Sequence, residues 1–271
     1  MQPMLTIALR AARSAGDLIV RSMDRLDRLA INEKEAKDYV TDIDRAAEQL
    51  IIESIRKAHP DHAFRGEESG DIKGTGEGAD YQWIIDPLDG TTNYINRIPH
   101  FAVSIACRYR GRLEHAVVYD PLRDEDFVAS RGRGAMLNGR RLRVGKRNNL
   151  NHAVLATGFP FRDGQMSHID NYLQMFKALA GQTAGIRRAG AASLDLAYVA
   201  AGRYDGFWEY GLSEWDMAAG ALLVQEAGGL ISDFTGDHRF LEQGHVVAGS
   251  PKCFKAILTS IQPFVPDSFR N

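Results

Sequence analysis

"WIIDPLDGTTNYI", residues 83–95, joins an apolar stretch directly to two aspartates, a glycine and two threonines. The apolar run before Pro87 predicts a buried β-strand. We expect that strand to end at Asp86, because Pro87 lacks a ladder donor and leaves the Leu88 carbonyl free. Residues 89–92 predict a helix start, whose exposed N–H groups attract an anion such as phosphate. Two carboxylates at the end of a buried strand are costly unless a positive charge shares the site.

The segments around this stretch predict two kinds of architecture. Apolar residues recur at helical spacing over residues 5–23 and 47–58, and Thr41 to Asp44 has the spacing of a capping box before the second helix. Residues 70–80 are rich in glycine and acidic residues, so we expect a mobile loop there. Most of residues 83–144 has the pattern of short strands joined by turns, which predicts an antiparallel sheet.

After residue 148 the pattern changes to strands and helices in alternation, which predicts a mixed α/β sheet. We therefore expect an α+β N-terminal half, residues 1–150, and an α/β C-terminal half, residues 151–271. No linker-like spacer separates the halves, so we expect them to pack as one unit.

The composition excludes several classes of protein. The chain has 271 residues, a net charge of −2 and 44% apolar residues, which is typical of a globular protein and not of a bulk nucleic-acid binder. It has two cysteines at no metal-binding spacing, which favours reduced thiols and a cytoplasmic location. No apolar run approaches the ~20 residues of a membrane span, so we expect no membrane partner.

Two further acidic motifs lie far from the first along the chain. "FRGEESG" carries Glu67, and "GLSEWDMAAGALL" carries Asp216 at capping-box distance from Ser213. Each motif alone has a structural explanation, because aspartates commonly cap turns and helices. Together, Glu67, Asp86, Asp89 and Asp216 form a set of hard oxygen ligands without histidine or cysteine at zinc spacing, which suits Mg²⁺. Such ions activate water and neutralise charge on a phosphate ester.

Three motifs in this order, "GEES", "WIIDPLDGTTNY" and "WDMAAGALLVQEAGG", resemble the inositol monophosphatase family, its bacterial members in particular. The resemblance covers nearly the full chain. It implies a layered αβαβα fold of the sugar-phosphatase type, with an antiparallel sheet in the N-terminal half and a mixed sheet in the C-terminal half. It also implies a homodimer, dependence on two or three Mg²⁺ ions per active site, and inhibition by lithium.

The resemblance also implies metal ligands at particular positions. Glu67, Asp86 and the Leu88 carbonyl would hold the activating Mg²⁺, and Asp86, Asp89 and Asp216 would hold a second ion. Glu67 would also face a weaker third ion. Asp216 would have a further role, steering the water that protonates the leaving alkoxide.

The remaining site residues follow from the same resemblance. Thr91, hydrogen-bonded to Asp44, would position the attacking water, and the amides of Gly90 and Thr91 would receive the phosphate. Without the resemblance, Asp44 is a residue of the capping box. The substrate's hydroxyl groups would contact Glu209 and the nearby backbone of Gly190 and Ala192. Without the resemblance, Glu209 is better explained as a solvated charge.

The predicted reaction is hydrolysis of inositol 1-phosphate and related phosphomonoesters by metal-activated water, without a phosphoenzyme. "PLDGT" also echoes the nucleophile loop of haloacid dehalogenase phosphatases, but Pro87 stands where their nucleophilic aspartate would be. Sister enzymes acting on fructose 1,6-bisphosphate or 3′-phosphoadenosine nucleotides remain alternatives, although "GTTNYINRIPHF" favours the monophosphatase branch. Phe159 stands where many animal relatives have a small polar residue, so the preferred substrate stays open.

A second class of function is an interaction protein. The segment "GRRLRVGKR", residues 139–147, concentrates five basic residues that could bind RNA or an acidic protein surface. Leu142 and Val144 alternate with them, which favours a solvated strand with one buried face. The resemblance to bacterial members nevertheless implies a role in ribosomal-RNA transcription antitermination, with NusA and RNA polymerase as partners.

Overall fold

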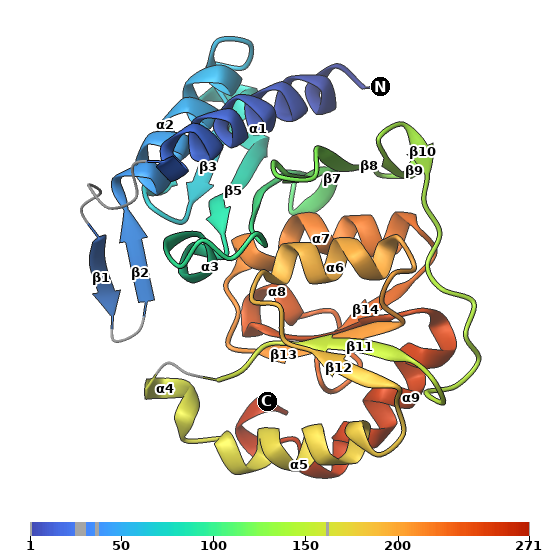
Figure 1. The fold of residues 1–271 in the computed structure, drawn as a ribbon. Coiled ribbons are helices and arrows are strands. Elements are labelled where there is room, and N and C mark those ends of the chain that lie inside the picture. The colour runs from blue at the N-terminus through green and yellow to red at the C-terminus, as the bar shows by residue number, and fades with distance from the viewer. Residues whose placement is uncertain (1, 25–30, 36–37, 161–162, 271) are drawn as a thin grey trace.

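The computed structural model describes residues 2–24, 31–35, 38–160 and 163–270, with the side-chain surroundings of 31–35, 38–41 and 163–164 outside that description. Helices and sheets alternate in five layers (Figure 1). Two helices cover an eight-stranded sheet, two more lie between that sheet and a five-stranded sheet, and a last pair covers the outer face. The expected αβαβα fold is confirmed.

The first layer consists of α1 (Pro3–Ser22) and α2 (Asp42–Arg56). Both are amphipathic, as expected, and their apolar faces pack against one face of the eight-stranded sheet. The expected capping role of Thr41 falls outside the described side chains. A short hairpin of β1 (Ile31–Glu35) and β2 (Asp38–Thr41) precedes α2.

The eight-stranded sheet has the order β10-β9-β8-β7-β6-β5-β3-β4. Its pairs are antiparallel except for β3 and β5, which are parallel. Its strands are β3 (Ala63–Gly66), β4 (Gly70–Ile72), β5 (Tyr81–Asp89), β6 (Ala102–Tyr109), β7 (Arg112–Asp120), β8 (Glu125–Ser130), β9 (Gly134–Leu137) and β10 (Arg140–Arg141). The loop expected over residues 70–80 is wrong, because this segment contains β4 and a 3₁₀ helix over Gly76–Asp80.

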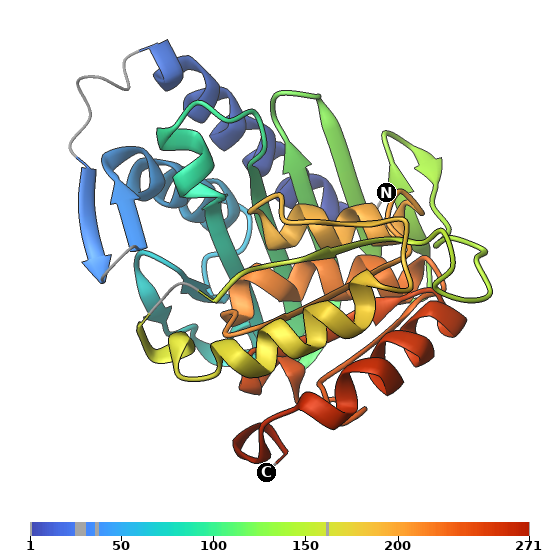
Figure 2. The ribbon, with the colours of Figure 1, turned by 60° about the horizontal axis from the view of Figure 1, so that its bottom comes forward.

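The middle layer consists of α6 (Ala192–Ala200) and α7 (Glu214–Glu226), which lie side by side between the sheets (Figure 2). Every residue of α6 is buried, because sheets cover both of its sides. The two helices approach closely: a side chain at Gly220 would lie 2.4 Å from the Leu196 Cβ. The N-terminal ends of these helices meet the end of β5, and this meeting point positions the site.

The five-stranded sheet has the order β12-β11-β13-β15-β14 and mixes parallel and antiparallel pairs. Its strands are β11 (Val154–Thr157), β12 (Gly185–Arg187), β13 (Gly206–Tyr210), β14 (Leu230–Ser232) and β15 (His245–Gly249). The outer layer is formed by α5 (Ile169–Ala180) and α9 (Pro251–Ile261) (Figure 2). The shorter helices are α3 (Thr91–Ile95), α4 (Asp163–Met166) and α8 (Phe240–Gln243). Within the described ranges, no helix has the length and apolar character to cross a membrane.

Candidate active site

The two aspartates of "DPLD" share one face of β5 because the strand contains a bulge. Asp86 pairs with Ser104 and Asp89 with Ala102, so three steps along β5 match two steps along β6. Residues three apart in a regular strand point to opposite faces, and the extra residue of a bulge brings them to the same face. The expectation that the strand ends at Asp86 is therefore wrong. Pro87 lies in the bulge, where its missing N–H breaks no regular ladder bond.

The residues after the bulge fix the turn into α3. Gly90 has a φ of +95°, and a Cβ there would lie 3.0 Å from the His100 carbonyl oxygen, so the position requires glycine. The Thr91 hydroxyl lies 3.1 Å from Asp44 Oδ1 and 3.0 Å from the Leu88 carbonyl oxygen, either of which can accept its proton. The expected pairing of Thr91 with Asp44 is thus present in the structure.

Glu67 reaches the site from the end of β3, held there by a buried carboxylate on α2. Glu48 is 2% exposed and accepts hydrogen bonds from the amides of Glu68 and Ser69, at 2.9 and 2.8 Å. A Cβ at Gly66 would lie 2.3 Å from Glu48 Oε2, so only glycine lets the two segments meet. The backbone after Glu67 is therefore hydrogen-bonded to α2, and Gly66 before it packs against the same carboxylate.

Asp216 both caps α7 and faces the site. Its Oδ2 accepts a 2.7 Å hydrogen bond from the Ser213 amide, and the two residues form the capping box expected from their spacing. Asp216 also lines the same cavity as Asp86 and Asp89. The structural and the functional explanations of this residue are therefore compatible.

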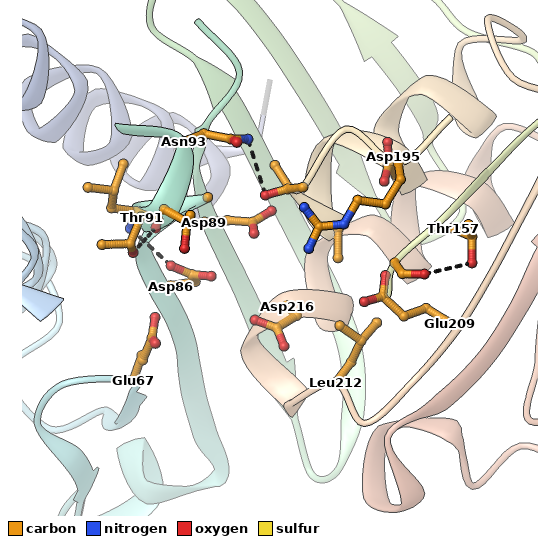
Figure 3. A pocket seen from close by; sticks show the side chains of 18 residues that line it. Glu67, Asp86, Asp89, Thr91, Asn93, Thr157, Asp195, Glu209, Leu212 and Asp216 are labelled. Carbon is orange, nitrogen blue, oxygen red and sulfur yellow. Dashed lines mark hydrogen bonds between the residues drawn. The ribbon is translucent and has the colours of Figure 1, made fainter. Parts of the chain in front are cut away.

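A cavity of about 140 Å³ lies where these elements meet. Figure 3 shows Glu67, Asp86, Asp89 and Asp216 pointing into it from β3, β5 and α7. The other residues predicted for the site also line it, except Asp44, which contacts the lining residue Thr91; the lining set includes Leu88, Gly90, Thr91, Gly190, Ala192 and Glu209. Five segments far apart in the chain thus converge on one cavity.

Burial and mutual repulsion govern the acidic groups. Burial, followed by the negative charges of Glu67, Asp89 and Asp216, raises the pKa of Asp86 well above its ordinary value. Burial also raises the pKa of Asp89 to about 6, against the opposing effect of hydrogen bonds from Ser193. A positive charge in the cavity would offset this repulsion among the carboxylates.

The substrate side of the cavity is built around Glu209 on β13. A Cβ at Gly158 would lie 1.7 Å from Glu209 Oε1, so the carboxylate rests directly on the glycine backbone. Phe159 is 41% exposed, packs edge-on against Tyr172 and is not among the described residues that line the cavity. Phe159, which stands where many animal relatives have a small polar residue, thus lies beside the cavity and does not line it.

Four residues that shape the cavity were not predicted from the sequence. Ser193 donates to Asp89 Oδ2 from its amide and its hydroxyl, at 2.7 and 2.5 Å. Asn93 donates to the His100 carbonyl at 2.7 Å, and its side chain also lies within reach of Gly190. Asp195 and Arg188 line the cavity as well. No local spacing marks Ser193, Asp195 and Arg188, because they reach the site through tertiary contacts, whereas Asn93 lies within the motif of residues 83–94.

The donor set fits Mg²⁺. Six carboxylates line the cavity, namely Glu67, Asp86, Asp89, Asp195, Glu209 and Asp216, whereas Arg188 is the one cationic side chain among the described lining residues. Buried carboxylates need positive partners, and oxygen ligands suit Mg²⁺. In the described part of the chain, no three acidic, histidine or cysteine residues are arranged so that they could hold a metal ion without moving.

Comparisons with known proteins agree with this geometry. Residues 1–265 match the model of the inositol monophosphatase family. The Nus factor SuhB of Pseudomonas aeruginosa is 73% identical over 271 residues, 100% of both chains. The extragenic suppressor protein suhB of Bartonella henselae has a TM-score of 0.93 at 41% identity, covering 97% of this chain and 100% of that one. The inositol monophosphatase of Anabaena (Nostoc) sp. PCC 7120 has a TM-score of 0.84 at 36% identity, covering 97% of each chain.

The fold and the acidic cavity therefore define a phosphatase of the layered αβαβα class. Within that class, the chain belongs to the inositol monophosphatase family.

Proposed function

We propose that this protein hydrolyses inositol 1-phosphate and related phosphomonoesters in a Mg²⁺-dependent reaction. The observation that carries the proposal is the convergence of Glu67, Asp86, Asp89 and Asp216 on one cavity that Glu209 also lines. When bound there, Mg²⁺ would lower the pKa of a water molecule and neutralise charge on the phosphate ester. Membership of the family supports the same reaction class.

The acidic residues divide into two overlapping ligand sets. Glu67, Asp86 and the carbonyl of Leu88 would hold one Mg²⁺, and Asp86, Asp89 and Asp216 would hold a second. Glu67 would also face a weaker third ion. The raised pKa of Asp86 supports this assignment, because bound cations would offset the repulsion among these carboxylates.

The chain's own residues orient the reacting groups. Thr91, whose hydroxyl lies within hydrogen-bond distance of Asp44, would position the attacking water, and Asp216 would steer the water that protonates the leaving oxygen. Gly90 and Thr91 line the cavity, and their amides would receive the phosphate. Because α3 has only five residues, these amides matter more here than a long helix dipole.

The alcohol part of the substrate would contact three further residues that line the cavity. Glu209 would accept hydrogen bonds from ring hydroxyls, beside the backbone of Gly190 and Ala192. A carboxylate pressed against Gly158 has little freedom to move, which favours a defined arrangement of hydroxyls. This supports a polyol phosphate over a flat aromatic ester.

Steady-state kinetics over a panel of phosphomonoesters, with Mg²⁺ titrated, tests the proposal. We expect inositol 1-phosphate to exceed fructose 1,6-bisphosphate and 3′-phosphoadenosine nucleotides in kcat/KM. Asp89→Asn or Asp216→Asn should abolish most of the turnover. Near-normal turnover by either variant would contradict the metal assignment.

Three further properties follow from family membership as proposals. We expect inhibition by Li⁺ in the kinetic assay and a homodimer in size-exclusion chromatography with light scattering. Free, buried Cys107 and Cys253 support a cytoplasmic location. Full turnover in millimolar Li⁺ would contradict the proposed inhibition. A monomer at all protein concentrations would contradict the proposed homodimer.

A second candidate function is assembly with NusA and RNA polymerase in ribosomal-RNA transcription complexes. The name of the Pseudomonas aeruginosa relative, a Nus factor, supports it. So does the exposed charge of Arg140 and Arg141 on the edge strand β10, followed by exposed Arg143. The expected buried face is also present, because Leu142 is 7% exposed. Pull-down of NusA by catalytically inactive Asp89→Asn protein would support this role. If NusA binding is lost when the arginines at 140, 141 and 143 are replaced by glutamine, but not in Asp89→Asn, the binding surface includes β10.

A further inference from the structure

An ionic cluster lies beside the candidate active site, at the start of α7. Glu214 Oε2 accepts a 2.9 Å hydrogen bond from Arg65 Nη1, and Glu214 Oε1 accepts one from Arg108 Nη1. Arg65 also pairs with Asp71 on β4, and Arg108 donates to Gln82 on β5. We name the set of Glu214, Arg65, Arg108, Gln82 and Asp71 the Glu214 clamp.

The clamp joins β3, which leads into Glu67, to α7, which carries Asp216. Arg65 lies on β3, two residues before Glu67, and Glu214 is the first residue of α7, two residues before Asp216. Leu212 lines both the active-site cavity and a neighbouring cavity that Arg65, Arg108 and Glu214 also line. A shift of Glu214 relative to Arg65 would therefore change the separation of Glu67 and Asp216.

The clamp is partly buried and held from two sides. The Glu214 side chain is 10% exposed, and those of Arg65 and Arg108 are 35% and 24% exposed. Two guanidinium groups on one carboxylate restrict its position more than a single surface ion pair does. The carboxylate also lies at a helix N-terminus, where negative charge is favourable.

A second contact supports the same end of α7. The Ser104 hydroxyl on β6 donates to the carbonyl of Trp215 at 3.2 Å, and Ser104 is the register partner of Asp86. The first turn of α7 is thus attached to the sheet at Glu214 and at Trp215.

We infer that the Glu214 clamp is a positioning device that sets the separation of Glu67 and Asp216 and so determines how tightly the cavity holds Mg²⁺. This inference rests on the proposed function, in which both carboxylates are metal ligands. Arg65 and Glu214 act through Glu67 and Asp216 and touch neither metal nor substrate. Outer partners that orient metal ligands commonly change metal affinity by about 10- to 100-fold when they are removed.

The alternative explanation is a simple effect of charge, which predicts a change in Mg²⁺ affinity of the opposite sign when Arg65 is replaced. Removing the positive charge of Arg65 close to an acidic cavity should strengthen Mg²⁺ binding if only the electrostatic field matters. Positioning predicts the reverse, because loss of Arg65 frees one side of Glu214. The sign of the change therefore separates the two explanations.

Isothermal titration calorimetry with Mg²⁺ on the full-length protein provides the test. We expect Arg65→Gln to weaken Mg²⁺ binding by about 10-fold. Arg65→Lys keeps the charge but loses the fork that contacts both Asp71 and Glu214, and it should weaken binding by a smaller factor. The double variant with Glu214→Gln should bind no more weakly than Glu214→Gln alone, since both changes remove the same contact.

A matched control is the pair of Arg203 and Glu125, an ion pair of similar exposure, 37% and 17%, that does not line the cavity. Glu125→Gln should lower the melting temperature without changing Mg²⁺ affinity. Unchanged or tighter Mg²⁺ binding by Arg65→Gln and Arg65→Lys would overturn the inference while leaving the proposed function intact. Absence of Mg²⁺ binding by the unmodified protein would instead overturn the proposed function itself.

Discussion

Replacing Asp89 by asparagine should stabilise the metal-free protein while it abolishes activity. Asp89 is 9% exposed, and its Oδ2 accepts both hydrogen bonds from Ser193. The asparagine side chain has nearly the same shape, and its oxygen can keep those bonds. The substitution therefore removes mainly a negative charge that burial and the charge of Glu67 make unfavourable.

The magnitude follows from the pKa of Asp89. Burial raises this pKa from 3.8 to about 6, which corresponds to about 3 kcal/mol of lost stability once the group is ionised. This is an upper limit, because the folded protein can relax around the charge. For a chain of this size, about 2–4 °C per kcal/mol gives a rise in melting temperature of up to about 12 °C at pH 8.

Thermal unfolding in EDTA and in Mg²⁺ is the assay. In EDTA, Asp89→Asn should melt above the unmodified protein, and saturating Mg²⁺ should stabilise the unmodified protein far more than the variant. Asp120→Asn is the control, because Asp120 is fully buried but accepts hydrogen bonds from the Leu122 amide and the Arg123 side chain. That variant should be destabilised in both buffers. If Asp89→Asn were destabilised in EDTA like the control, our account of the cavity's electrostatics would be wrong.

Three further predictions concern the same cavity. Because the pKa of Asp89 is raised in the folded protein, protonated Asp89 stabilises the fold at low pH, and this stabilisation is lost as the pH rises through about 6. In urea unfolding with EDTA, the free energy of unfolding of Asp89→Asn should therefore increase relative to that of the unmodified protein between pH 4 and pH 8. Gly66→Ala should destabilise the fold by about 2 kcal/mol in urea, because the new methyl group displaces Glu48 from its two amide donors; wild-type stability would contradict this. Gly158→Ala should raise KM for inositol 1-phosphate about 10-fold by displacing Glu209, with p-nitrophenyl phosphate turnover unchanged; equal effects on both substrates would oppose the assigned role of Glu209.

The ligand set could be predicted from the sequence because each carboxylate lies in a motif with a local signal. Asp216 lies at capping-box spacing, Glu67 precedes a turn, and Asp86 and Asp89 end an apolar run. The convergence of all four in one cavity supports that interpretation. Their roles as metal ligands stay a prediction until an ion is observed.

The shape of the site could not be predicted, because it depends on contacts between distant segments. The sequence predicted that the strand ends at Asp86, because proline breaks a strand ladder. The bulge at Pro87 instead lets the strand continue to Asp89 and places Asp89 on the same face as Asp86. Ser193 and Glu48 orient Asp89 and the backbone around Glu67 from other helices, and no spacing in the sequence connects them.

The glycines of residues 70–80 also led to a wrong prediction, that of a mobile loop. Side chains at Gly74 and Gly78 would each come within 2.5 Å of an Asp61 atom. These glycines permit close packing of a 3₁₀ helix, whereas composition alone predicts mobility.

Anomalous diffraction from crystals grown with Mn²⁺ in place of Mg²⁺ would test the central claim most directly. We predict anomalous peaks inside the cavity, within about 2.3 Å of carboxylate oxygens of Glu67, Asp86, Asp89 and Asp216. A map without peaks there, at Mn²⁺ concentrations that support turnover, would contradict the metal-dependent mechanism.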